Sequence, residues 1–139
     1  MEQLPDKLKD YAEGFYNLIW PSEESQIFRL EEVESVTIAD EIVGHPQRKV
    51  ARTIGRTKEG VKLEVVVDKE KGHIEYAKAR IKAEEGTLLC KYEGEQPGVY
   101  FIKSNGEICS VDRKGILGEI DELEAKMVKV RALYSGDLD

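Results

Sequence analysis

The first apolar pattern along the chain is that of an amphipathic helix. Its apolar residues recur at steps of three and four: Leu8, Tyr11, Ala12, Phe15, Leu18 and Ile19. Pro5 suits the first turn of such a helix. A residue that precedes proline is pushed out of helical geometry, so we expect the helix to end at Trp20-Pro21.

Turn signals rich in glycine and proline then divide residues 34–111 into short segments of alternating character. Apolar residues occupy every second position in several of these segments, such as Val36 and Ile38, or Leu63, Val65 and Val67. This pattern predicts an antiparallel meander of six or seven strands. A turn at Glu59-Gly60 would place Val50 and Ile54 on the sheet face that carries Leu63, Val65 and Val67.

The last hairpin of the meander has the clearest turn signal. Asn105-Gly106 is a preferred pair for a two-residue type I′ turn. Such a turn sets Ile102 opposite Cys109, and Tyr100 opposite Val111.

Two segments allow two interpretations. We expect residues 22–33 to form a short helix, although residues 26–30 also fit a strand. We expect residues 73–85 to form a strand, but Glu75 to Arg80 favour a helix that Gly86 would cap. If residues 73–85 were helical, the order of elements would be similar to that of type III secretion chaperones.

An apolar seam predicts a C-terminal helix. Its members fall at steps of four and three: Ile116, Ile120, Leu123, Met127, Val130 and Tyr134. Asp112 can cap the start, Gly136 can end the helix, and residues 136–139 would form a frayed tail. We expect the seam to pack across one face of the sheet, with pairing to a second copy of the chain as the alternative. The whole chain, residues 1–139, is then a single α+β domain.

Composition and charge narrow the class of protein. The 139 residues are 40% hydrophobic and 35% charged, as in a globular protein, with a net charge of −7. The charge is segregated: residues 48–82 hold eleven basic and five acidic residues, a net +6, and the rest carries −13. Asn and Gln are scarce beside Glu, Lys and Arg, a balance typical of thermophile proteins. No leader or membrane span is apparent, so a cytoplasmic location is expected.

Cysteine and histidine give no sign of a metal or cofactor site. Cys90 and Cys109 lie in strand-like runs, where buried free thiols are expected. His45 and His73 are not spaced with the cysteines in any zinc pattern. No nucleophile motif is present, although His45, in the turn Gly44-His45-Pro46, is a candidate general base or ligand contact.

The basic stretch supplies the candidate binding site. Arg48, Arg52 and Arg56 project to one face of a strand, and Lys62 follows on the next strand. Guanidinium groups spaced in this way can hold phosphate or carboxylate. In the alternative interpretation, their stems cover apolar surface and their heads pair with the surplus Glu and Asp of the helices. The anion site would be excluded if Arg52 and Arg56 were both fully paired with Glu or Asp of their own chain.

Several functions are compatible with this sequence. We expect a non-enzymatic binding module, acting as a homodimer, that engages a protein partner or an anionic ligand through the basic strand face. The alternatives are a small-molecule carrier, whose order of elements is similar to the helix-grip fold, a nucleic-acid-binding protein, and a small enzyme without a motif. Lys78, Arg80 and Lys82 would widen the patch for nucleic acid, but only Tyr76 offers a stacking surface nearby.

Overall fold

The structure is a computed structural model that describes residues 2–21 and 33–134. It contains helix α1 (Asp6–Ile19), eight strands and helix α2 (Glu122–Tyr134). The strands are β1 (Val33–Val43), β2 (Arg48–Thr57), β3 (Val61–Asp68), β4 (Ile74–Ala83), β5 (Gly86–Tyr92), β6 (Gly98–Lys103), β7 (Ile108–Val111) and β8 (Leu117–Gly118). They form one antiparallel sheet in sequence order, which confirms the α+β meander between two helices. The sheet has eight strands and not the six or seven predicted, because the two-residue strand β8 lies in a segment predicted to belong to the C-terminal helix. The predictions for residues 22–32 and 136–139 fall outside the described residues.

Helix α1 confirms the pattern that predicted it. It follows Pro5 and ends before Trp20, whose N–H donates to the Tyr16 carbonyl at 2.7 Å. Its apolar face, with Leu8, Ala12 and Phe15 fully buried, packs on β4 and β5. Burial of these side chains against the sheet holds the helix in place.

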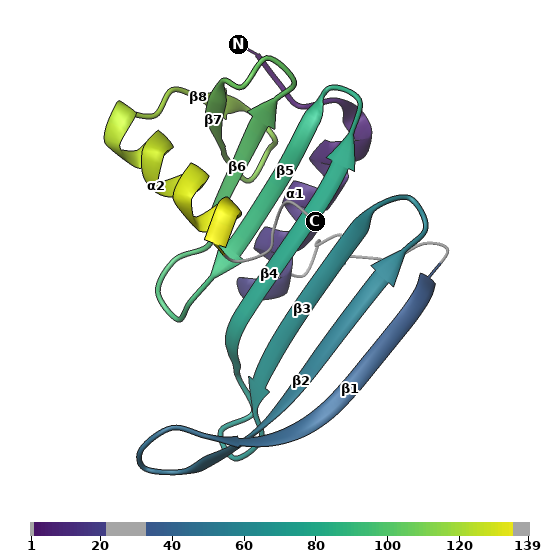
Figure 1. The fold of residues 1–139 in the computed structure, drawn as a ribbon, viewed down its shortest axis with the longest axis vertical. Helices are drawn as coiled ribbons and strands as arrows, with labels where there is room; N and C mark the ends of the chain where they lie inside the picture. The colour runs from purple at the N-terminus through teal and green to yellow at the C-terminus, as the bar shows by residue number, and fades with distance from the viewer. Residues whose placement is uncertain (1, 22–32, 135–139) are drawn as a thin grey trace.

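The two helices cover opposite faces of the sheet. Successive strand residues point to opposite sides, and Leu88 and Cys90 pack with α1 while Leu89 packs with Val128 of α2. Figure 1 shows α1 behind β4 and β5, and α2 in front of the later strands. We call the two sides of the sheet the α1 face and the α2 face.

Residues 74–83 form strand β4, as expected from the turn spacing. The alanines of this segment lie on the α1 face, where Ala77 and Ala79 let the helix approach closely. Tertiary packing therefore overrides its helix propensity. The similarity to secretion chaperones, which depended on a helix here, does not hold.

The predicted pairing of β2 with β3 was wrong by one residue. The connecting loop has three residues, Lys58 to Gly60, and Gly60 adopts a positive φ of 92°. The Gly60 N–H donates to the Thr57 carbonyl at 3.3 Å, as in a turn that closes with a glycine bulge. Val50 and Ile54 therefore lie opposite Asp68 and Glu64, on the face away from Leu63, Val65 and Val67.

A three-residue loop in place of the predicted two-residue turn also shifts the register of the β6–β7 hairpin by one residue. Its loop also has three residues, Ser104 to Gly106, and the Gly106 N–H donates to the Lys103 carbonyl at 2.9 Å. Phe101 lies opposite Cys109, and Tyr100 lies opposite Ser110. The type I′ turn predicted at Asn105-Gly106 is therefore not formed.

The C-terminal helix is shorter than predicted, and a different side of it faces the sheet. Asp112 stabilises a turn instead of a helix, because its side chain accepts hydrogen bonds from the N–H groups of Lys114 and Ile116. Asp121 caps α2 through the Glu124 N–H at 2.7 Å. Helix α2 packs across one face of the sheet, as predicted, but most of the seam does not face the sheet: Leu123, Met127 and Val130 are 70%, 49% and 51% exposed, while Ile120 packs at the start of the helix. Val128 and Ala125 face the sheet instead.

Candidate functional site

Three basic residues lie side by side across the middle of the sheet. Arg56 of β2 lies directly opposite Lys62 of β3, which lies opposite Arg80 of β4. We call these three residues, all on the α2 face, the basic row. Cβ atoms at directly opposed positions are about 5 Å apart, so like charges there repel one another. Among the residues that the structure describes, Arg56 and Lys62 have no ion-pair partner.

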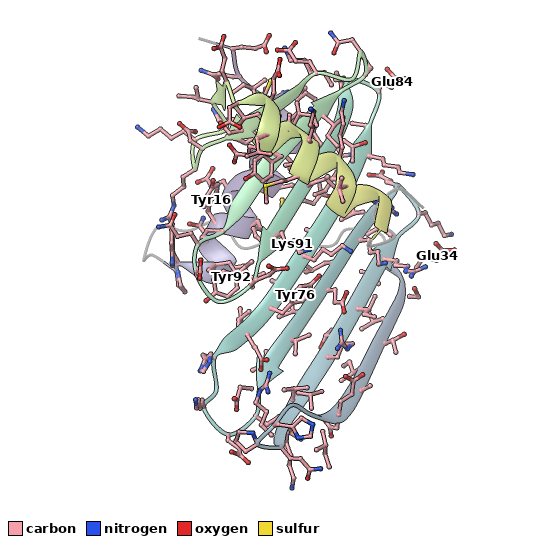
Figure 2. All side chains as sticks on the ribbon, turned by 60° about the vertical axis from the view of Figure 1, so that its left-hand side comes forward. Tyr16, Glu34, Tyr76, Glu84, Lys91 and Tyr92 are labelled. Carbon is pink, nitrogen blue, oxygen red and sulfur yellow. The ribbon has the colours of Figure 1, made fainter. Side chains whose placement is uncertain are left out.

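A second pair of cations strengthens the positive charge beside the basic row. Lys78 of β4 lies opposite Lys91 of β5, on the same face. Burial lowers the pKa of Lys78, and the nearby charges of Lys62 and Lys91 lower it further. Figure 2 shows Lys91 and Tyr76 on the part of the sheet that α2 leaves open. Lys91 also contacts Glu93 at 3.3 Å.

Arg52 has carboxylate partners in its own chain. It donates to Glu41 at 3.2 Å and to Glu64. The hydrogen bond to Glu41 is the largest cause of its raised pKa, followed by the bond to Glu64. Arg48 is likewise paired with Glu75. Arg52 thus links β2 to both of its neighbours, β1 and β3, whereas Arg48 reaches across β3 to β4. Both arginines are paired, as in the alternative interpretation of the basic stretch, but their partners lie on strands and not on the helices.

The paired arginines border a shallow hollow on the α2 face. It has a volume of about 320 Å³ and includes both ion-pair clusters together with apolar side chains. Its lining residues are Val43, Arg48, Val50, Arg52, Glu64, Val66, Glu75 and Tyr76. The neutralised charges leave the hollow without the free guanidinium groups that an anion would need.

The five residues predicted to form one site therefore separate into three places. Arg48 and Arg52 border the hollow, whereas Arg56 and Lys62 belong to the basic row. His45 is exposed in the turn between β1 and β2, at the end of β2 opposite to Arg56. An anion site was to be excluded if Arg52 and Arg56 were both fully paired. Arg52 is paired, but Arg56 has no ion-pair partner in the described part of the chain, so the site is not excluded.

Catalytic and metal-binding groups do not gather elsewhere in residues 2–21 and 33–134. No group of three or more His, Cys, Asp or Glu side chains in these ranges is placed to hold a metal ion. Cys90 and Cys109 are buried free thiols, as expected. Burial raises the pKa of the Cys90 thiol, which keeps it in the unreactive neutral form.

Two apolar surfaces are exposed, and exposure was predicted only for the first, as the alternative to packing on the sheet. One is the seam on α2, and the other is the row Val36, Ile38 and Ile42 on β1, which are 54%, 71% and 64% exposed. The periodicity of both was visible in the sequence. Periodicity shows that residues share a face, but it does not show whether the same chain covers that face.

The fold and these surfaces define an α+β protein with an open antiparallel sheet, flanked by one helix on each face. No known protein family, curated protein or solved structure matches the chain. No helix in the described part of the chain is long and apolar enough to cross a membrane.

Proposed function

We infer that the protein is a non-enzymatic interaction module that binds an acidic segment of a protein partner on the α2 face. The observation that carries this proposal is the basic row. The directly opposed cations Arg56 and Lys62 cost stability, and such local conflicts are expected where function requires them. We also propose that the module is a cytoplasmic homodimer, and that its charge-rich composition reflects a thermophilic source.

An acidic peptide fits this surface better than the alternative ligands. An extended segment that carries carboxylates at every second position, about 6.7 Å apart, could reach both Arg56 and Lys62, whose long side chains can adjust to the strand spacing of about 4.8 Å. Arg80 is only 8% exposed and contributes charge from below. Nucleic acid is the second candidate, because the same cations could contact phosphates, but among the described strand residues only Tyr76 and Tyr100 offer aromatic rings on the α2 face. A helix-grip carrier is less well supported, since Val128 packs directly on Leu89 and Ile108 beneath α2.

The proposal is tested with poly-L-glutamate and single-stranded DNA as probes. The variant carries Arg56→Ala and Lys62→Ala, and the control carries Lys58→Ala and Lys71→Ala. The control removes two exposed turn lysines and makes the same change in net charge. Removal of two cations at about 0.2–1 kcal/mol each should weaken poly-L-glutamate binding by roughly 2- to 30-fold at low salt. The control should bind nearly as well as the original protein.

Each other outcome has a definite meaning. Equal losses in the variant and the control would show binding by net charge alone and would refute a site at the basic row. Stronger binding to DNA than to poly-L-glutamate, with a steep salt dependence, would assign the row to nucleic acid instead. Binding by neither probe would refute the proposed anionic partner.

A further inference from the structure

Half of the sheet is a single layer with an apolar side. Helix α1 lies over β4 and β5, and the α1 face of β1 and β2 extends beyond it (Figure 1). This face carries Val36, Ile38 and Ile42 on β1, and Ala51 and Thr53 on β2. Leu63, Val65 and Val67 of β3 continue it toward α1 and are only partly buried. We call this surface the open apolar face.

Charge is almost absent from the open apolar face. In a chain with 35% charged residues, only Asp40 and Lys49 interrupt it, and Asp40 is already paired with Lys69 at 3.3 Å. The α2 face of the same strands carries Glu41, Arg48, Arg52, Arg56, Lys62 and Glu64. The contrast arises within single strands, between alternate residues.

An apolar sheet face of this kind requires a second layer. Stable domains bury the hydrophobic side of a sheet against another sheet or a helix. Monomeric proteins rarely expose contiguous apolar patches larger than a few hundred Å². Three side chains of the β1 row are more than half exposed, so β1 has no such cover in the described part of the chain.

We propose that the open apolar face is a homodimer interface, on which the same face of a second copy packs as the opposite layer of a sandwich. Two sheets packed in this way lie about 10 Å apart with interdigitated side chains. A twofold axis brings each residue of the patch close to its counterpart, so the patch must be compatible with itself. This inference specifies the contact surface of the homodimer proposed above and does not depend on the basic row.

The charge distribution favours a second copy of this face. Asp40 is balanced by Lys69 of its own chain, and Lys49 lies near the end of the patch, so two copies meet through a surface with little charge to repel them. The α2 face would meet its own cations if it were paired with itself, which is unfavourable. Of the two faces, only the open apolar face is suited to self-association.

The size of the patch predicts a reversible dimer. Three strands span about 14 Å, and seven residues along a strand extend about 20 Å, so each copy offers roughly 300 Å² of sheet. Two copies therefore bury about 600 Å² of flat sheet, below the roughly 1,000 Å² that a stable specific interface exceeds, so the contact is that of a weak, transient dimer. We therefore expect association that varies with protein concentration.

Two neighbouring residues of β1 provide a matched test. Ile38→Lys places a charge on the open apolar face, and Thr37→Lys places the same charge on the α2 face of the same strand. Sedimentation equilibrium from micromolar to millimolar protein should show a wild-type mass that rises toward twice that of the chain. Ile38→Lys should raise the dimer dissociation constant at least about tenfold, and Thr37→Lys less than about threefold. Ile42→Lys, at a second exposed position, should behave as Ile38→Lys does.

Several results would overturn the assignment. Equal weakening by Thr37→Lys would indicate pairing of β1 edges, and weakening only by Leu123→Lys with Met127→Lys would assign the dimer to the seam of α2. A monomer at every concentration, with a lower free energy of unfolding in Ile38→Lys, would mean that the chain covers its own face. Poly-L-glutamate binding should survive Ile38→Lys, so the two proposals can fail separately.

Discussion

Arg52 and Arg56 lie on the same face of β2, yet they should respond differently to replacement by alanine. Arg52→Ala removes the hydrogen bonds to Glu41 and Glu64 and leaves two carboxylates without their cation. The Glu64 side chain is only 16% exposed, so its charge is poorly compensated by water. Arg56→Ala removes a cation that faces Lys62 and breaks no ion pair within the described residues.

The expected loss of unfolding free energy in Arg52→Ala follows from how exposed Arg52 and its two carboxylate partners are. Two partly exposed ion pairs contribute about 0.2–1 kcal/mol each, and the buried stem of Arg52 adds apolar contact, for a total of about 1–2 kcal/mol. In a chain of this size, that loss lowers Tm by about 3–6 °C. Arg56→Ala should change the free energy of unfolding by less than about 0.5 kcal/mol, or should stabilise the fold slightly.

Urea unfolding followed by circular dichroism measures both variants. The control is Arg52→Ala combined with Glu41→Gln, which removes the carboxylate that Arg52 leaves behind on β1 and should recover part of the lost stability. If Arg52→Ala were no more destabilising than Arg56→Ala, the ion pairs would not hold the strands together. Arg52 would then be available for a ligand, as the sequence pattern first suggested.

Two further predictions concern pH. The Tyr16 hydroxyl donates to the Val111 carbonyl at 2.7 Å, and burial raises the pKa of Tyr16 to about 12. Its contribution to the free energy of unfolding is therefore intact below pH 10 and is lost as pH rises toward 12. Tyr16→Phe should cost about 1 kcal/mol at neutral pH and flatten the alkaline part of a stability profile measured by urea unfolding. The Asp68 carboxylate accepts hydrogen bonds from the N–H groups of Lys71 and Glu70, which hold its pKa below the usual value. Its contribution is present above about pH 4 and disappears at lower pH, so Asp68→Asn should lose less stability on acidification than the original protein.

Element type was largely predictable from the sequence, whereas register was not. Residues 6–19 and 74–83 formed the expected helix and strand, because their periodicity and turn spacing are properties of the local chain. Register depends on loop length, and the signals at Gly60 and Gly106 fit both a two-residue turn and a three-residue loop that ends in glycine. The difference lies in backbone angles that the residue types alone do not determine.

The prediction of a single C-terminal helix along the apolar seam was wrong for another reason. Ile116 and Ile120 continue the spacing of Leu123 and Met127, but Gly115 adopts a positive φ of 82° in a turn that Asp112 stabilises. The apolar period thus crosses a turn, a short strand and the start of a helix. Within the helix, the side toward the sheet was decided by Val128, which lies outside the seam.

The three-residue loop at Gly60 links register to both proposed functions. With a two-residue turn, β3 would shift by one position relative to β2 and present its other face. Leu63 and Val65 would then lie beside Arg52, and Lys62 would lie on the apolar side. The separation of a charged face for a partner from an apolar face for a second copy therefore depends on a positive φ at one glycine. Because a residue with a Cβ adopts that angle only at a cost, the loop itself maintains the division between the two surfaces.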